Sequence, residues 1–476
     1  MPKLIVPGQR RAAARFTVSA VAIGLSLTWT TPGHAAKPPA PKLTTLRCLD
    51  ASTVPCAGGV QVVPGDDLRV LGRRIARGQR LTFRWSDGQS SARLVRKKGI
   101  GFVVRVPANT ATGTVSVTLK DRRGRRSNRL RLKVVDRPPA APASTVPDPP
   151  AVFTESGMWI FDLDAADGGT PAAILARARA ARVSTVFLKS ADGSTSQGSQ
   201  FSAEFVRALQ AGGVRVCAWQ YVYGTAPEAE AAIAIASIRA GADCFVINAE
   251  KEYAGRYAEA QRYLAALRAG VGAEYPVGLS SFGLPTSFPN FPFSVFLGPG
   301  GAQVDMPQVY WREFEQPVAL ISARVASGHR IYGRPIAPMG QTYNGATEDD
   351  VQSFRSTWAA YGAQGLSWFR WGVTPPEVWE ALAQPAPTLD PEDDPGWQAF
   401  ALGSSGDGVV WLQQHLAAVD PSVEIDGVFG AGTDAALRRF QAKQGFPETG
   451  QTGPRTWQAL LALTPKRVDW AARARR

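Results

Sequence analysis

A short buried strand that ends in two polar side chains is the feature that most constrains this chain. Residues 244–249 are mostly apolar, and Asn248 is followed two positions later by Glu250. Side chains two apart on a strand point the same way, so Asn248 and Glu250 should project together. Ala-rich helical segments lie on both sides. Such a unit is typical of a (β/α)8 barrel, in which chemistry lies at the carboxyl ends of strands. The alternative is a carboxylate that caps the next helix or pairs with Lys251.

The region 158–385 repeats this alternation of strand and helix. Strands are predicted at 159–164, 185–190, 214–221, 244–249, 276–281, 304–311, 336–342 and 366–371. Helices are predicted to begin near Pro171, Ala203, Pro227, Arg256, Pro317, Glu348 and Pro376. Only the connection 282–301 is irregular, because it is long and rich in Phe. The pattern predicts a (β/α)8 barrel; a doubly wound open sheet is the alternative, but no Gly-rich phosphate motif supports it.

Carboxylates are the reagents that the predicted barrel offers. The three histidines, at 34, 329 and 415, do not fall at strand ends, so we expect neither a histidine triad nor a metal, and no cofactor. The candidate catalytic residues are Glu250, Asp162 and Asp164. The candidate substrate-binding residues near strand ends are Asn248, Gln308, Tyr310, Trp219, Tyr221, Trp311, Trp368 and Trp371. Asp305 should lie on the helix side, because it does not share a face with Gln308. Each aromatic ring could equally pack in the core.

With these residues the barrel resembles the lysozyme-like family 25 glycoside hydrolases. That family has an Asp on the first strand, an Asp-x-Glu on the fourth and aromatic strand ends. The resemblance implies that Glu250 is the catalytic acid and that Asp162 or Asp164 is the first-strand carboxylate. Asn248 departs from the family, which has Asp there; an amide can bind substrate but cannot act as base or nucleophile.

The segment 399–463 carries the most specific pattern in the chain. Its matched stretches are LGSSGDGVVWLQQHL (402–416), DGVFGAGTDAALRRFQAKQGF (426–446) and TGQTGPRTWQAL (449–460). They resemble the peptidoglycan-binding type-1 domain, which implies binding to the cell wall. Apolar spacing within these stretches predicts a three-helix bundle, in which most motif residues would be core or turn positions.

The segment 43–136 shows short alternating runs separated by turn residues, which predicts an all-β sandwich. Its strings VPGDDLRVLG, VPANTATGTVSVTL and SNRLRLKVV resemble the immunoglobulin-like IPT/TIG family. Cys48 and Cys56 are expected to form a local disulfide. Cys217 and Cys244 lie in neighbouring predicted strands at different depths, and we expect them to be buried free thiols, with a bond between them as the alternative.

Positive charge is concentrated in this predicted sandwich. The chain has a formal net charge of +14, and residues 43–137 hold 21 Lys and Arg against 6 Asp and Glu. Eight of these cations lie in KDRRGRRSNRLRLK, residues 120–133. The stripe could contact anionic wall polymers; the alternative is a solvated edge strand that its charges protect from aggregation. Nucleic acid is not expected as a partner of an exported protein.

The first 36 residues predict a secretory signal, with a basic start, an apolar core at 18–27 and the small-residue site Gly33–Ala36. Arg10-Arg11 hints at twin-arginine export, but ordinary export is favoured. No membrane span is expected afterwards. The remaining segments are predicted as linkers at 137–157 and 386–398 and a basic tail at 464–476.

Together these features predict a secreted, multidomain, wall-associated protein whose partner is peptidoglycan or a related polysaccharide. The first hypothesis is a muramidase-like glycoside hydrolase that uses carboxylate acid/base chemistry. The second is a non-catalytic scaffold whose barrel binds glycan without cleaving it. A second carboxylate within reach of Glu250 would discriminate between them.

Overall fold

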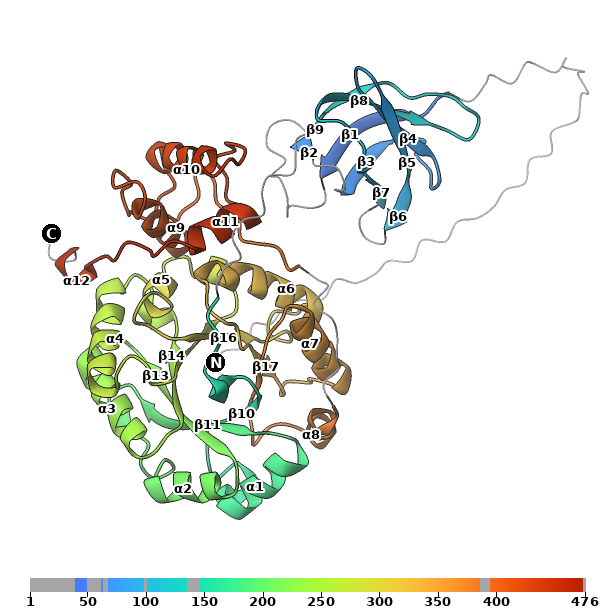
Figure 1. Cartoon of the computed structure of the whole chain (residues 1–476). Coiled ribbons are helices and arrows are strands. Elements are labelled where there is room, and N and C mark those ends of the chain that lie inside the picture. Colours follow the sequence, from blue (N-terminus) through green and yellow to red (C-terminus); the bar gives the residue numbers. More distant parts are fainter. Residues whose placement is uncertain are drawn as a thin grey trace, which may run out of the picture. The chain divides into compact units, whose positions relative to one another are not determined.

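Eight parallel strands form a closed barrel in the centre of the chain. The structure is a computed structural model that describes residues 39–48, 61–62, 67–97, 101–134, 146–385 and 394–473. The barrel strands follow one another in the order β10-β18-β17-β16-β15-β14-β13-β11, and β10 also pairs with β11, which closes the ring. Helices surround these strands (Figure 1). The predicted (β/α)8 barrel is therefore confirmed, and the open sheet is excluded.

The elements alternate along the chain as the sequence predicts. The strands are β10 (Ser156–Ile160), β11 (Thr185–Asp192), β13 (Arg215–Val222), β14 (Cys244–Ala249), β15 (Val277–Phe282), β16 (Val304–Val309), β17 (Met339–Gln341) and β18 (Leu366–Phe369), with the short β12 (Thr195–Ser196) beside β11. The helices are α1 (Pro171–Ala180), α2 (Ala203–Ala211), α3 (Pro227–Arg239), α4 (Tyr257–Val271), α5 (Phe293–Phe296), α6 (Val318–His329), α7 (Glu348–Ala360) and α8 (Pro376–Ala383). Each predicted helix begins within one residue of the observed one.

Side-chain capping explains three of these helix starts. The Thr347 hydroxyl accepts a hydrogen bond from the Asp350 backbone N–H, and the Asp350 carboxylate accepts one from the Thr347 N–H. This capping box satisfies donors that have no partner in the first turn of α7. Thr170 and Ser202 cap α1 and α2 in the same way with their hydroxyls. Such signals depend on neighbours in sequence, which is why the sequence alone predicts them.

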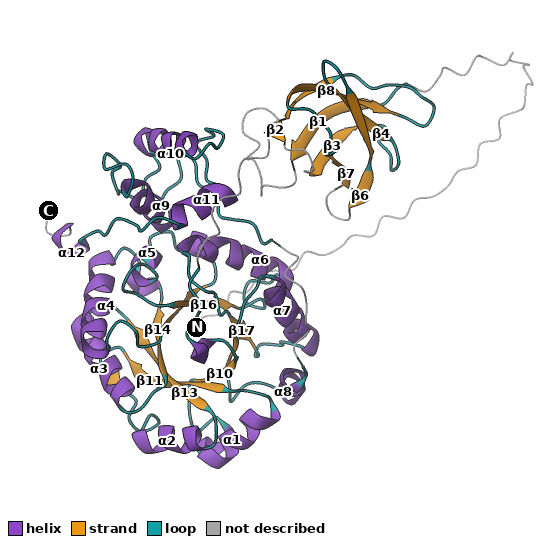
Figure 2. Ribbon diagram, viewed as in Figure 1, coloured by secondary structure: helices purple, strands orange, loops and turns teal. Residues whose placement is uncertain are grey.

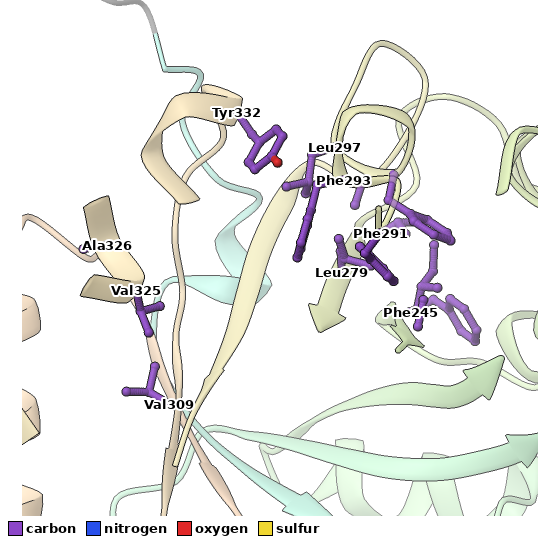
Figure 3. Packing of buried hydrophobic residues seen from close by; sticks show 14 of the residues in the cluster. Phe245, Leu279, Phe291, Phe293, Leu297, Val309, Val325, Ala326 and Tyr332 are labelled. Atoms are coloured by element: carbon purple, nitrogen blue, oxygen red, sulfur yellow. The ribbon is translucent and has the colours of Figure 1, made fainter. Parts of the chain in front are cut away.

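The barrel strands are buried on both faces, and each face belongs to a different core. On β14, Cys244 and Val246 contact the cluster inside the barrel, whereas Phe245 and Ile247 contact the cluster between strands and helices. Figure 2 shows the strands enclosed by the ring of helices. Figure 3 shows part of the outer cluster, where Phe245 packs near the Phe-rich connection after β15. Asn248 therefore continues the face that points into the barrel.

Cys217 and Cys244 form a disulfide, so the expectation of free thiols is wrong. The two residues are direct partners in the parallel pairing of β13 and β14, with a Cα–Cα distance of 4.5 Å. They therefore lie at the same depth, and both side chains point into the barrel. The predicted Cys48–Cys56 bond lies outside the described residues.

Asp305 lies on the helix side of β16, as the sequence predicts. Its side chain is buried, and Oδ2 lies 2.7 Å from Nδ1 of His329, the last residue of α6. The other ring nitrogen of His329 lies 3.0 Å from the Phe282 carbonyl oxygen. This pair joins α6 to two strands and is separate from the barrel interior.

Two sheets precede the barrel. One contains β1 (Lys42–Cys48), β3 (Asp67–Arg73), β7 (Gly101–Arg105) and β6 (Val95–Lys97), and the other contains β2 (Gln61–Val62), β9 (Leu130–Val134), β8 (Gly113–Lys120), β4 (Arg80–Arg84) and β5 (Gln89–Arg93). Buried residues of both sheets, such as Leu68 and Phe83, belong to one hydrophobic cluster. The described residues thus form a two-sheet, all-β region with its own core.

Three helices follow the barrel: α9 (Asp407–Ala417), α10 (Ala431–Lys443) and α11 (Pro454–Leu461), before the short α12 (Trp470–Arg473). Gln413 accepts a hydrogen bond from the Gly427 N–H and donates to Asp426 and Thr433. Gln441 binds the second turn in the same way, through Gly450 and Thr449. The glutamines of the sequence motif therefore hold the turns between helices.

Candidate functional site at the mouth of the barrel

A cavity of about 420 Å³ opens at the carboxyl ends of the barrel strands. Its described lining residues are Trp159, Asn248, Glu250, Phe282, Gly283, Phe288, Gln308, Tyr310, Glu313, Phe314, Met339 and Phe369. They come from β10, β14, β15, β16, β17 and β18 and from the loops that follow β14, β15 and β16. The cavity is thus built at the end of the barrel that carries chemistry in this fold.

Glu250 is the side chain that the surrounding groups orient most closely. Asn248 Nδ2 donates to Glu250 Oε1 at 3.1 Å, and Gln308 Nε2 donates to the same oxygen at 2.9 Å. Asn248 itself is buried, and its Nδ2 also lies 3.4 Å from the Ser280 carbonyl oxygen. Both amides therefore bind the same oxygen of the Glu250 carboxylate. The sequence prediction that Asn248 and Glu250 project to the same side of the strand is confirmed, because their side chains are hydrogen-bonded.

Aromatic rings form the walls around this carboxylate. Trp159 lies in the barrel floor and stacks on Phe187. The ring of Phe282 at the end of β15 is stacked on that of Phe288, which lies in the irregular Phe-rich connection. Flat apolar faces of this kind suit the faces of sugar rings. The sequence predicted an unusual loop here but did not assign these Phe residues to the site.

Tyr310 and Gln308 line the cavity, as the sequence predicts. The Tyr310 hydroxyl donates to the Met339 sulfur at 3.7 Å, and its ring lies near those of Tyr343 and Phe369. Burial raises the pKa of Tyr310 well above its usual value, and the negative charges nearby act in the same direction. Its hydroxyl therefore stays neutral and able to donate.

A second acidic group lies beside the cavity. The Tyr221 hydroxyl donates to Glu252 at 2.7 Å. Burial, the bond to Glu252 and the charge of Glu250 all raise the pKa of Tyr221. A similar pair lies at the end of β11 and just after β13: the Tyr223 hydroxyl donates to Asp192, and Asp192 also binds Lys189 at 2.6 Å. Tyr221 and Glu252 are thus paired with each other.

Asp162 and Asp164 do not lie at this cavity. Both follow the end of β10, both are exposed, and the Asp164 N–H donates to Asp162 Oδ1 at 3.1 Å. Trp159 points into the barrel and Ile160 points outward, so the alternation directs Asp162 away from the mouth. Neither residue is among the described lining residues. The expected approach of a first-strand Asp to Glu250 is not what the structure shows.

Four of the predicted aromatic residues pack in cores instead of lining the cavity. Trp219 is buried inside the barrel, where its Nε1 donates to the Ile160 carbonyl oxygen at 3.1 Å. Trp311, Trp368 and Trp371 belong to the cluster between strands and helices. The sequence did not show which face of the strand each of these residues occupies, because both faces of the barrel strands are apolar.

Among the described residues, no group of three or more His, Cys, Asp or Glu side chains could hold a metal ion. Over the same part of the chain, no helix is both long and apolar enough to cross a membrane.

Two curated proteins match short parts of the chain. Over 68 residues the chain is 43% identical to a spore cortex-lytic enzyme of Bacillus cereus. This match covers 14% of the chain and 26% of the enzyme. Over 94 residues it is 34% identical to a zinc D-Ala-D-Ala carboxypeptidase of Streptomyces albus G, covering 17% of this chain and 37% of that protein. The chain thus matches well under half the length of either relative.

Remote neighbours of the barrel are found among solved structures. One is a family 25 glycosyl hydrolase from Bacillus anthracis, with 14% sequence identity and a TM-score of 0.23 over 32% of this chain and 69% of that one. Likeness at this level carries no argument about the reaction. Residues 405–460 match the family described as a putative peptidoglycan binding domain. This segment is therefore a peptidoglycan-binding domain.

Proposed function

We propose that the protein is an exported, wall-bound glycoside hydrolase that cleaves peptidoglycan or a related wall glycan at the mouth of its barrel. The observation that carries the proposal is Glu250, held by two amide donors in an aromatic-walled cavity. The peptidoglycan-binding domain on the same chain would keep this cavity close to its substrate. Export rests on the signal pattern of residues 1–36.

Glu250 acts as the general acid in this proposal. Asn248 and Gln308 fix Oε1, and Oε2 delivers its proton to the glycosidic oxygen as the bond to the sugar breaks. The rings of Trp159 and Phe282 hold the sugar by their apolar faces. The sequence assigns the sandwich an IPT/TIG-like fold, and its basic stripe would add contacts to anionic wall polymers.

Replacing Glu250 with Gln tests the proposal. The variant keeps the shape of the side chain but removes the proton, so release of reducing ends from purified walls should fall by about 10²-fold or more. Wall binding should be unchanged. Glu204→Gln, at an exposed position in α2, is the matched control and should keep full activity.

The second candidate function is a scaffold that binds wall glycan without cleaving it. Asn248 favours it, because the family that the barrel resembles has Asp at that position. If the wild-type protein releases no reducing ends from any wall glycan, while Glu250→Gln and wild type bind walls equally, the scaffold replaces the hydrolase.

A further inference from the structure

The hydrolase proposal needs a second carboxylate, and the cavity contains one that the sequence did not single out. Among the described residues that line it, two carry a carboxylate: Glu250 and Glu313. Glu313 lies in the loop between β16 and α6. We propose that Glu313 is the general base that activates water for attack on the sugar. This inference rests on the proposed function and names the partner of Glu250.

Several hydrogen bonds hold Glu313 in place. The Tyr343 hydroxyl donates to Glu313 Oε1. The Glu313 N–H donates to the Tyr310 carbonyl oxygen at 3.1 Å, which folds the loop back over the end of β16. The Tyr343 ring lies against two lining residues, 6.0 Å from the ring centre of Tyr310 and 6.1 Å from that of Phe369. The carboxylate is therefore tied to the wall of the cavity.

Tyr310 links the two carboxylates electrostatically. Burial raises its pKa first, and the negative charges of Glu250 and Glu313 act in the same direction. One partly buried hydroxyl thus senses both acids, which agrees with their place in one cavity. Glu313 itself is exposed, and water is therefore available to it.

The other nearby acids have different partners. Glu252 accepts from Tyr221, and Asp192 is bound by Lys189 and Tyr223. Neither is among the described lining residues of the cavity. Glu313 is therefore the acid that shares the lining of this cavity with Glu250.

The reaction follows from these two positions. The oxygen of a water molecule attacks the anomeric carbon, and Glu313 takes a proton from that water. The bond between the anomeric carbon and the leaving oxygen breaks, and the proton on Glu250 Oε2 passes to that oxygen. Attack and departure take place on opposite faces, so the product has the inverted anomeric configuration. Exchange of one proton with solvent restores both carboxyl groups.

Glu313→Gln in the full chain is the first test. We expect kcat on wall glycan to fall by about 10²-fold or more, with KM changed by only a few fold. Glu315→Gln is the matched control, because it is an exposed acid in the same loop, and it should keep wild-type activity. NMR of the first product should show inversion, and azide should restore turnover to Glu313→Ala with formation of an inverted glycosyl azide.

Tyr343→Phe tests the assignment without removing the carboxylate. Loss of the donated hydrogen bond leaves the Glu313 carboxylate free to turn away from the cavity wall, so kcat should fall by about 10-fold while KM changes little. Wild-type kcat in Tyr343→Phe, full activity of Glu313→Gln, or retention of configuration would overturn the role of Glu313. If Glu250→Gln abolishes wild-type turnover while Glu313→Gln does not, this inference fails and the hydrolase proposal stands; a wild-type protein without activity overturns both.

Discussion

Gln308 helps to fix the orientation of the Glu250 carboxylate. It donates to Oε1 from β16, two strands away from β14, while Asn248 donates to the same oxygen from β14 itself. An Asp at position 248 would place two negative charges side by side; the amide instead supplies a donor. Asn248 is therefore better suited to orient an acid than to share in the chemistry.

Gln308→Leu should lower kcat/KM on wall glycan by about 10- to 100-fold, because a misplaced acid loses alignment with the leaving oxygen. Binding to walls should be unchanged. The control is Gln364→Leu, at an exposed position away from the mouth. Wild-type kcat/KM in Gln308→Leu would show that the carboxylate needs no second donor.

At the scale of elements, the sequence predicted what local signals determine. The helices α1, α3 and α8 begin with Pro at or next to their first residue, and α7 begins with a capping box. These signals act within one turn, so the sequence suffices to find them.

The inward or outward direction of strand residues was harder to predict. Every residue of β14 is buried, so its apolar run does not show which face looks into the barrel. The direction of β10 depends on its pairing with β11 and β18, far away in sequence. This is why Asp162 and Trp368 were expected at the mouth although neither lies there, and why Glu313, in a loop after the strand, was missed.

The disulfide between β13 and β14 is a consequence of the same pairing. Replacing Cys217 and Cys244 together with Ala should reduce the free energy of unfolding by about 3 kcal/mol in the chain-entropy picture, since the bond spans 27 residues. Urea unfolding of oxidised wild type and the double variant measures this. Reduced wild type should match the variant. Alkylation of both thiols in unreduced, unfolded protein would show that no bond was present.

At the scale of the whole molecule, the wall-binding domain packs against the barrel through α9. Ten of its eleven residues are buried, although one helix of a small bundle normally keeps an exposed face. Trp411 Nε1 donates to the Ile331 carbonyl oxygen at 2.7 Å, and Trp411 joins the same hydrophobic cluster as Tyr332. The domain is thus anchored to the barrel near the α6 end.

Removing this domain should remove most of the wall binding. A chain that ends at Pro385 should lose sedimentation with purified sacculi, whereas residues 395–465 alone should sediment with them. The isolated domain should carry Trp411→Gln, because the α9 face that contacts the barrel in the full chain would otherwise be exposed and could cause nonspecific pelleting. A sample without sacculi controls for such pelleting. Equal sedimentation of the shortened and full chains would instead assign anchoring to the basic sandwich.

Asp407 makes the contact between domain and barrel sensitive to pH. Its carboxylate is buried and accepts from the Ser294 N–H at 2.9 Å, the Ser294 hydroxyl at 2.5 Å and the Tyr332 hydroxyl at 2.9 Å. Burial nevertheless dominates and raises the pKa of Asp407 to about 6, against 3.8 for the ordinary group. The folded protein therefore keeps a proton that the unfolded chain releases. The stability that this proton supplies is full below about pH 4 and is lost as the pH rises through 6.

Asp407→Asn isolates this effect, because the amide does not titrate. The free energy of unfolding of wild type, taken relative to the variant, should fall by roughly 3 kcal/mol between pH 4 and pH 7. Urea unfolding at four pH values, followed by Trp fluorescence, measures the difference. Asp420→Asn is the control on the surface of the same domain, and burial gives its carboxylate no comparable rise in pKa. The contrary outcome is a difference in unfolding free energy between wild type and Asp407→Asn that stays constant from pH 4 to 7. Asp407 would then remain ionised in the folded protein, and its three hydrogen bonds would outweigh the cost of burying the charge.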